Sequence, residues 1–170
     1  RGMKTVKDMN DAIRARCKSI DLMVQCAADG AINAEIAVVT ESPNEREVTM
    51  GMPLVGSAGQ TLWTALRKYN LTRNQVYVTS TVKRQLAYND GRAGIGADEL
   101  QHWEHLLRWE LLQLPNVRYV LVLGNMTLHA LYGEKGIMQW RGSVKPIELR
   151  HVETYVDKPP VVMTKHMTGV

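Results

Sequence analysis

A short β-branched run, Ile36–Thr40 (IAVVT), ends at the carboxylate of Glu41, and a segment rich in glycine, Gly51–Trp63 (GMPLVGSAGQTLW), follows it. The run predicts a buried strand. The glycines lead into an amphipathic pattern, so backbone N–H groups are exposed where a helix begins. Because open α/β sheets bind ligands beyond the carboxyl ends of their strands, we expect a functional site at Glu41.

The rest of the chain alternates between helical and strand patterns. Apolar spacing and turn residues predict helices over Met3–Cys26, Gly59–Tyr69 and Glu99–Leu114 and a short helix to Leu131. Strands are predicted over Gln75–Val82, Val117–Leu123, Arg150–Val156 and Pro160–Thr164. Tyr88–Ala97 is predicted to be an exposed loop. This order predicts an α/β fold: a three-layer α/β/α sandwich with a mostly parallel central sheet of about four strands.

The composition fits a single domain over residues 3–170, with Arg1 and Gly2 outside the fold as a cloning scar would be. With 45% hydrophobic and 22% charged residues the chain is not expected to be disordered, and no run is long enough to cross a membrane. Cys17 and Cys26 favour a reducing, intracellular location, in cytoplasm or nucleoid, and not secretion. We expect no metal site and a monomer. The net charge of +4 is compatible with nucleic-acid binding without demanding it.

Six short blocks follow one another along the chain. They are TESPN (Thr40–Asn44), GMPLVGSAGQ (Gly51–Gln60), VTSTVKR (Val78–Arg84), LGNMTLHAL (Leu123–Leu131), WRG (Trp140–Gly142) and TKHMTG (Thr164–Gly169). In order and spacing they resemble the motifs of the uracil-DNA glycosylase superfamily, most closely its family 4. The resemblance implies a DNA glycosylase, a hydrolase of base excision repair that flips a base out of DNA and hydrolyses its N-glycosidic bond.

The resemblance also implies roles for particular residues. Glu41 would orient or activate water and face the cationic sugar, and His166 would donate a hydrogen bond to the departing base. The expected base pocket comprises Ser42, Pro43, Leu54 and Ser80, and the expected DNA contacts are Gly56, Ser57, Gly59, Gln60, Lys83, Arg84, Arg92, Arg141 and Lys165. These residues have structural alternatives. Glu41 can cap the next segment or pair with Arg46, and His166 and the basic residues can be solvated surface groups. The glycines can be plain turn residues, and Ser80 can bond to a neighbouring carbonyl.

The chain departs from the family pattern at positions that matter for chemistry. Family 4 carries an iron–sulfur cluster on four cysteines, whereas here only Cys17 is near a ligand position and Arg84 and Trp103 stand at two others. We therefore expect no cofactor, with the tryptophan and apolar groups in the cluster's place. Ser80 replaces an asparagine and Leu54 a phenylalanine, which predicts weaker selection of plain uracil and room for a modified base.

Two other functions remain open at this point. One is a non-catalytic DNA-binding or protein-interaction module on a degenerate scaffold of the same superfamily. The other is a nucleotide-handling enzyme on a flavodoxin-like sheet, against which the missing phosphate-loop and dinucleotide fingerprints argue.

Overall fold

A six-stranded sheet forms the centre of the molecule in the computed structural model, which describes residues 2–155 and 158–169, and only the backbone of residues 150–168. Its strands are β1 (Asp29–Gly30), β2 (Ile36–Thr40), β3 (Tyr77–Ser80), β6 (Tyr119–Val122), β7 (Lys145–Tyr155) and β8 (Lys158–Gly169), in the order β1-β3-β2-β6-β8-β7. The four inner strands β3, β2, β6 and β8 are parallel, and β1 and β7 are antiparallel to their neighbours.

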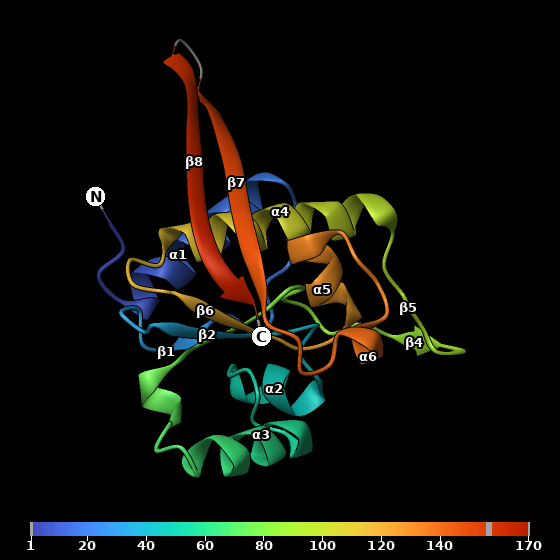
Figure 1. The fold of residues 1–170 in the computed structure, drawn as a ribbon. Coiled ribbons are helices and arrows are strands. Elements are labelled where there is room, and N and C mark those ends of the chain that lie inside the picture. The colour runs from blue at the N-terminus through green and yellow to red at the C-terminus, as the bar shows by residue number, and fades with distance from the viewer. Residues whose placement is uncertain (1, 156–157, 170) are drawn as a thin grey trace.

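Helices cover both faces of this sheet (Figure 1). On one face lie α1 (Val6–Ser19), α4 (Ala97–Gln113) and α5 (Asn125–Tyr132), and on the other lie α2 (Glu45–Met50) and α3 (Ser57–Arg67). Short elements complete the chain: η1 (Arg73–Gln75), α6 (Ile137–Trp140) and a separate hairpin of β4 (Tyr88–Asn89) and β5 (Arg92–Ala93). The predicted α/β/α sandwich with a mostly parallel sheet is therefore confirmed. Among the described residues, no helix has the length and apolar character needed to cross a bilayer.

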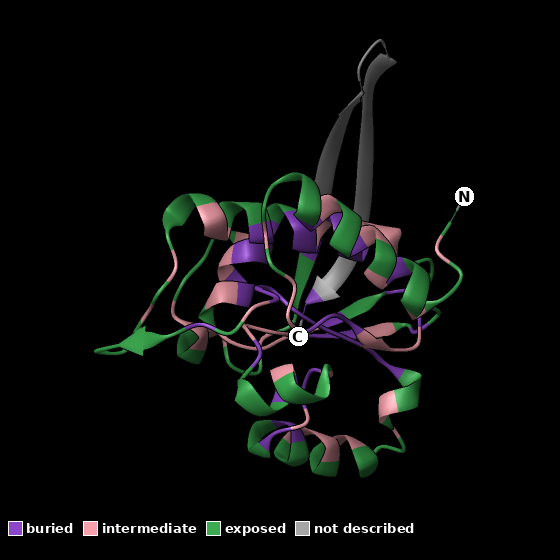
Figure 2. Cartoon of the chain, turned by 180° about the vertical axis from the view of Figure 1, so that it is seen from behind, coloured by how far each residue is buried: buried purple, intermediate pink, exposed green. Residues whose placement is uncertain are grey.

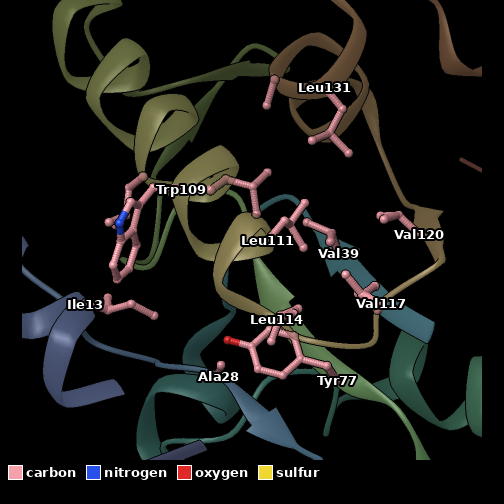
Figure 3. Close-up of a cluster of buried hydrophobic side chains, with 14 of the residues drawn as sticks. Ile13, Ala28, Val39, Tyr77, Trp109, Leu111, Leu114, Val117, Val120 and Leu131 are labelled. Carbon is pink, nitrogen blue, oxygen red and sulfur yellow. The ribbon is translucent and has the colours of Figure 1, made fainter. Parts of the chain in front are cut away.

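The core has two parts because side chains alternate along the central strands. Ala37 and Val39 of β2 point into the larger cluster with Tyr77 under α4 and α1 (Figure 3). Val38 points the other way, with Val78, into a smaller cluster under α3. The helices show the complementary pattern, with one buried face toward the sheet and an exposed outer face (Figure 2).

A charged group lies inside the larger part of the core. Lys83 and Glu110 are both fully buried, and the Lys83 Nζ is 2.7 Å from Glu110 Oε2. The Lys83 ammonium also donates to Thr79 Oγ1 and to the Ser80 carbonyl, each at 2.8 Å, and the Tyr77 hydroxyl donates to Glu110 Oε1 at 2.7 Å. This network joins the end of β3 to the middle of α4.

Several boundaries differ from the sequence-based prediction. The first helix runs over Val6–Ser19 and not to Cys26, because Asp21 adopts a positive φ of 56° and the Cys26 N–H donates to the Lys83 carbonyl instead. The segment between Pro43 and Gly51, for which no helix is predicted from the sequence, contains α2, whose start is fixed by a capping box between Asn44 and Glu47. The expected loop over Tyr88–Ala97 contains the β4–β5 hairpin.

Candidate active site at the carboxyl edge of the sheet

Glu41 lies directly after β2, at the edge where the parallel strands end. The Val82 N–H donates to the Glu41 carbonyl at 2.8 Å, which places the end of β3 beside it. The carboxylate reaches across to α5, where its Oε2 accepts from the Met126 N–H at 3.1 Å. Glu41 thus interacts with the first turn of α5, not with the segment that follows it in the chain, and that bond holds the carboxylate in one orientation at the edge.

Gly124 makes this arrangement possible. It precedes α5 with φ of +92°, and a Cβ atom built on it would overlap the side chain of Glu41. A residue other than glycine would be strained in this conformation and would displace the carboxylate. The sequence signal was present, because Gly124 follows a buried strand, but its contact with Glu41 could not be inferred from spacing.

The glycine-rich segment is held rigidly on the opposite side of the edge. The Arg73 guanidinium donates to Asp29 at 2.6 Å and to the carbonyls of Pro53 and Leu54. The Trp63 Nε1 donates to the same Leu54 carbonyl at 2.9 Å. These bonds tie the segment to β1, η1 and α3.

A cavity of about 690 Å³ borders Gly124 and extends between β6, α5, α6 and residues 141–145. Its volume is within the range of small-molecule sites. Tyr132 and Trp140 in its wall are stacked with ring centroids 6.4 Å apart, and the Lys145 Nζ lies 3.4 Å from the Trp140 centroid. Arg141 and Ser143 add polar groups. The WRG block pointed to this region through Arg141, but Trp140 and Tyr132 were not foreseen as part of a site.

The predicted base-pocket residues do not line this cavity. Leu54 is 5% exposed and belongs to the apolar cluster under α3, with a positive φ of 56° that turns it inward. Ser80 is 3% exposed, and Pro43 is also buried. Ser42 is half-buried beside Glu41. Leu54 and Ser80 are directed into the protein, away from this cavity, so their assignment to a base pocket stays a prediction.

The predicted DNA contacts divide into accessible and buried residues. Ser57, Gln60, Arg92 and Arg141 are exposed. Lys83 is fully buried in its pair with Glu110, so its assignment to a phosphate is wrong. Gly56 and Gly59 are buried; a Cβ on Gly59 would overlap the Leu54 carbonyl, so this glycine allows close packing and does not face a ligand. The Arg84 guanidinium is paired with Glu99 at 2.7 Å.

His166 is not placed beside Glu41 by the described backbone. It lies in β8 opposite Glu148, and the described residues of β8 meet β6 with Thr168 opposite Tyr119 and Gly169 opposite Val120. Because β6 and β8 are parallel, His166 precedes the first residue of β6, at the amino edge, whereas Glu41 lies at the carboxyl edge. The side chains of Lys165 and His166 lie outside the described residues.

The residues at the expected cluster position do not fit an iron–sulfur cluster. Cys17 is buried in the same apolar cluster as Trp103, and Arg84 is engaged by Glu99. Burial raises the pKa of the Cys17 thiol, and it raises the pKa of Cys26 to about 11, so both favour the neutral thiol over the thiolate that binds iron. Within the described part of the chain, no group of three or more His, Cys, Asp or Glu side chains is arranged to hold a metal ion.

The fold and the placement of Glu41 define an α/β protein with a candidate site at the carboxyl edge of its sheet. The family model of the Uracil DNA glycosylase superfamily matches residues 27–169. A type-4 uracil-DNA glycosylase of Thermotoga maritima is 38% identical over 55 residues, which are 32% of this chain and 29% of that protein. Its counterpart from Pyrobaculum aerophilum is 36% identical over 55 residues, 32% of this chain and 28% of that protein.

The protein belongs to the uracil-DNA glycosylase superfamily, since the family model covers most of the chain. The matches to the two curated relatives span less than a third of their length.

Proposed function

We propose that this protein is a DNA glycosylase that hydrolyses the bond between deoxyribose and a uracil-like or modified base flipped out of DNA. The observation that carries the proposal is the Glu41 carboxylate, oriented by the Met126 N–H and packed against Gly124, which also forms part of the cavity wall. In this proposal the everted base enters that cavity and the sugar lies at its mouth beside Glu41.

The reaction assigned to this site needs one water molecule. The C1′–N bond breaks with its electron pair moving to the base, and positive charge develops on the sugar. The carboxylate of Glu41 stabilises that charge and accepts a proton from the water that forms the new C1′–O bond. The departing base takes up a proton from solvent, and Glu41 returns the proton that it accepted to bulk water, so the carboxylate is regenerated. No metal or nucleotide is required for these steps.

His166 is the proposed donor to the departing base, but the described register of β8 keeps its backbone at the amino edge. The proposal therefore rests on Glu41, and His166 is tested separately. A His166→Ala variant should lose about two to three decades in rate if the imidazole reaches the base. Unchanged cleavage would remove His166 from the mechanism and leave Glu41 in place.

The experiment is an abasic-site assay on oligonucleotides that carry uracil, hypoxanthine, xanthine or a hydroxymethylated pyrimidine, in single and double strands. We expect cleavage on at least one substrate and about a 10²- to 10⁴-fold slower reaction for Glu41→Gln. The amide oxygen of glutamine can still accept from the Met126 N–H, so a purely structural role of Glu41 predicts little change. Glu45→Gln is the matched control, because Glu45 is an exposed carboxylate of α2.

A non-catalytic DNA-binding module is the second candidate. It is favoured by the burial of Leu54 and Ser80 and by the bond from Glu41 to α5, which gives the carboxylate a structural use. DNA binding without product on every base, with wild type and Glu41→Gln indistinguishable, would establish this alternative and overturn the enzymatic proposal.

A further inference from the structure

The β4–β5 hairpin is a short, well-defined projection. Asp90 and Gly91 at its tip have φ of 51° and 75°, the two positive values that a type I′ turn requires. Tyr88 pairs with Ala93, and Asn89 pairs with Arg92. At the base of the hairpin the Gly94 N–H donates to the Ala87 carbonyl at 2.6 Å. These bonds fix the direction in which the tip points.

The base of the hairpin is anchored to the protein by both apolar and charged contacts. Leu86 is buried in the core, and Ala93 and Ile95 pack against the same cluster. The Arg84 guanidinium donates to the Gly94 carbonyl at 3.4 Å while it is paired with Glu99 of α4. The hairpin therefore projects from the body on a firm support, and its tip is exposed (Figure 2).

The position of the hairpin links it to the candidate site. The chain leaves β3 at Ser80, passes Val82, whose N–H donates to the Glu41 carbonyl, and reaches Tyr88 six residues later. In Figures 1 and 2 the hairpin extends outward from the end of the sheet, away from α1. Glu41 and the segment that leads to the hairpin therefore both follow the carboxyl ends of neighbouring parallel strands, with Thr40 opposite Ser80.

The two faces of the hairpin carry different chemistry. Tyr88, on the face of Ala93, is 54% exposed, and its ring is a surface on which a base can stack. Asn89 and Arg92 share the opposite face, where an amide and a cation can contact phosphates. Two carboxylates belong to this region of the chain. Asp90 lies at the tip of the hairpin, and Glu99 lies in α4, where it is paired with Arg84.

We propose that the β4–β5 hairpin is a DNA-binding finger, in which Tyr88 stacks on an unpaired base of the strand next to the everted nucleotide and Arg92 contacts a phosphate. This inference rests on the proposed function in assigning DNA as the partner. It goes beyond that function because it assigns a second contact surface that is separate from Glu41 and from the cavity.

The test is fluorescence anisotropy of the full chain with a labelled duplex that contains one unpaired base and with its fully paired counterpart. Tyr88→Ala should bind the duplex with the unpaired base about 5- to 150-fold more weakly and the paired duplex with little change. Tyr88→Phe should restore wild-type binding, since it keeps the ring. Arg92→Ala should lower the slope of log affinity against log salt by about 0.9 on both duplexes.

Controls separate the finger from general surface effects. Tyr69→Ala removes a tyrosine that is 77% exposed after α3, and Arg14→Ala removes an exposed cation on α1 at the other end of the sheet; both should bind as wild type. Asp90→Asn keeps a residue suited to the type I′ turn and removes the negative charge, so it should bind more tightly. Far-ultraviolet circular dichroism establishes that each variant is folded.

The outcomes distinguish this inference from the proposed function. If Tyr88→Ala binds both duplexes as wild type does, the finger is refuted even where the protein excises a base. If Tyr88→Ala loses binding selectively but no variant or wild type forms product, the finger stands and the glycosylase proposal fails. Equal losses on both duplexes, with no rescue by Tyr88→Phe, would also refute stacking.

Discussion

Two carboxylates in this molecule have opposite surroundings. Glu110, in the interior, is fully buried and has both oxygens engaged, by Lys83 and by Tyr77. Glu41, at the carboxyl edge, is half-buried and accepts one backbone hydrogen bond through Oε2. A carboxylate enclosed by fixed partners can only stabilise the fold, whereas one that is held in place at an accessible edge is available to a substrate. The same contrast holds for two cations, because Lys83 is fully buried in its ion pair whereas Arg92 is exposed.

The two carboxylates should differ most in how much stability is lost when each is removed, and the interior one should cost more. Glu110→Ala leaves the Lys83 ammonium buried without its charge partner, so we expect the free energy of unfolding to fall by about 3–5 kcal/mol. Glu41→Ala should cost only about 1 kcal/mol, the value of one hydrogen bond. Urea unfolding measures both. The double variant Lys83→Met/Glu110→Leu removes both charges and should recover most of the lost stability. Similar losses of stability for Glu41→Ala and Glu110→Ala would show that burial does not distinguish the two carboxylates.

The edge itself can be tested through its glycine. Gly124→Ala introduces a Cβ at φ of +92° that overlaps Glu41, so we expect about 2–3 kcal/mol lower stability and loss of any activity that depends on Glu41. Gly133→Ala is the matched control, because Gly133 has φ of +70° after the same helix but open space around it. It should cost about 1 kcal/mol and leave activity intact. Equal effects of the two changes would mean that Gly124 serves backbone conformation alone.

The smallest effect concerns the buried thiols. Burial raises the pKa of Cys26 from its ordinary value of 9.0 to about 11, so the unfolded chain loses this proton at lower pH than the folded one. The contribution to stability is complete below pH 9 and is lost as the pH rises toward 11. Between these values Cys26→Ala should lose less stability than wild type, by up to about 1 kcal/mol after allowance for solvent screening. Parallel pH profiles of urea unfolding for the two proteins would contradict the shift.

Sequence patterns predicted the layers of the fold because the central strands are β-branched and buried on both faces. The predicted strand Ile36–Thr40 has the same bounds as β2. The position of Glu41 at the carboxyl edge then follows from the parallel topology of the sheet. The direction of Lys83 could not be predicted, since its partner Glu110 is on a distant helix. One signal existed: Glu110 falls three residues after Leu107 on the buried stripe of α4, where a lone carboxylate needs a cation.

The register of the last strands was beyond sequence reasoning. A strand near Pro160–Thr164 was foreseen, but its pairing with β6 depends on the two matched positions Thr168 and Gly169. A strand pair defined by so few backbone bonds has no turn or long apolar match to fix it from the sequence. The cavity walls were also missed, because Tyr132 and Trp140 meet through tertiary packing and not through a recognisable spacing.

Arg73 has a consequence for how the glycine-rich segment can respond to substitution. One guanidinium clamps Asp29 and two successive carbonyls, and it lies 5.3 Å from the ring of Trp63. Moving this segment would break several of these contacts at once. A substitution within it therefore exchanges a side chain on a backbone that stays in place.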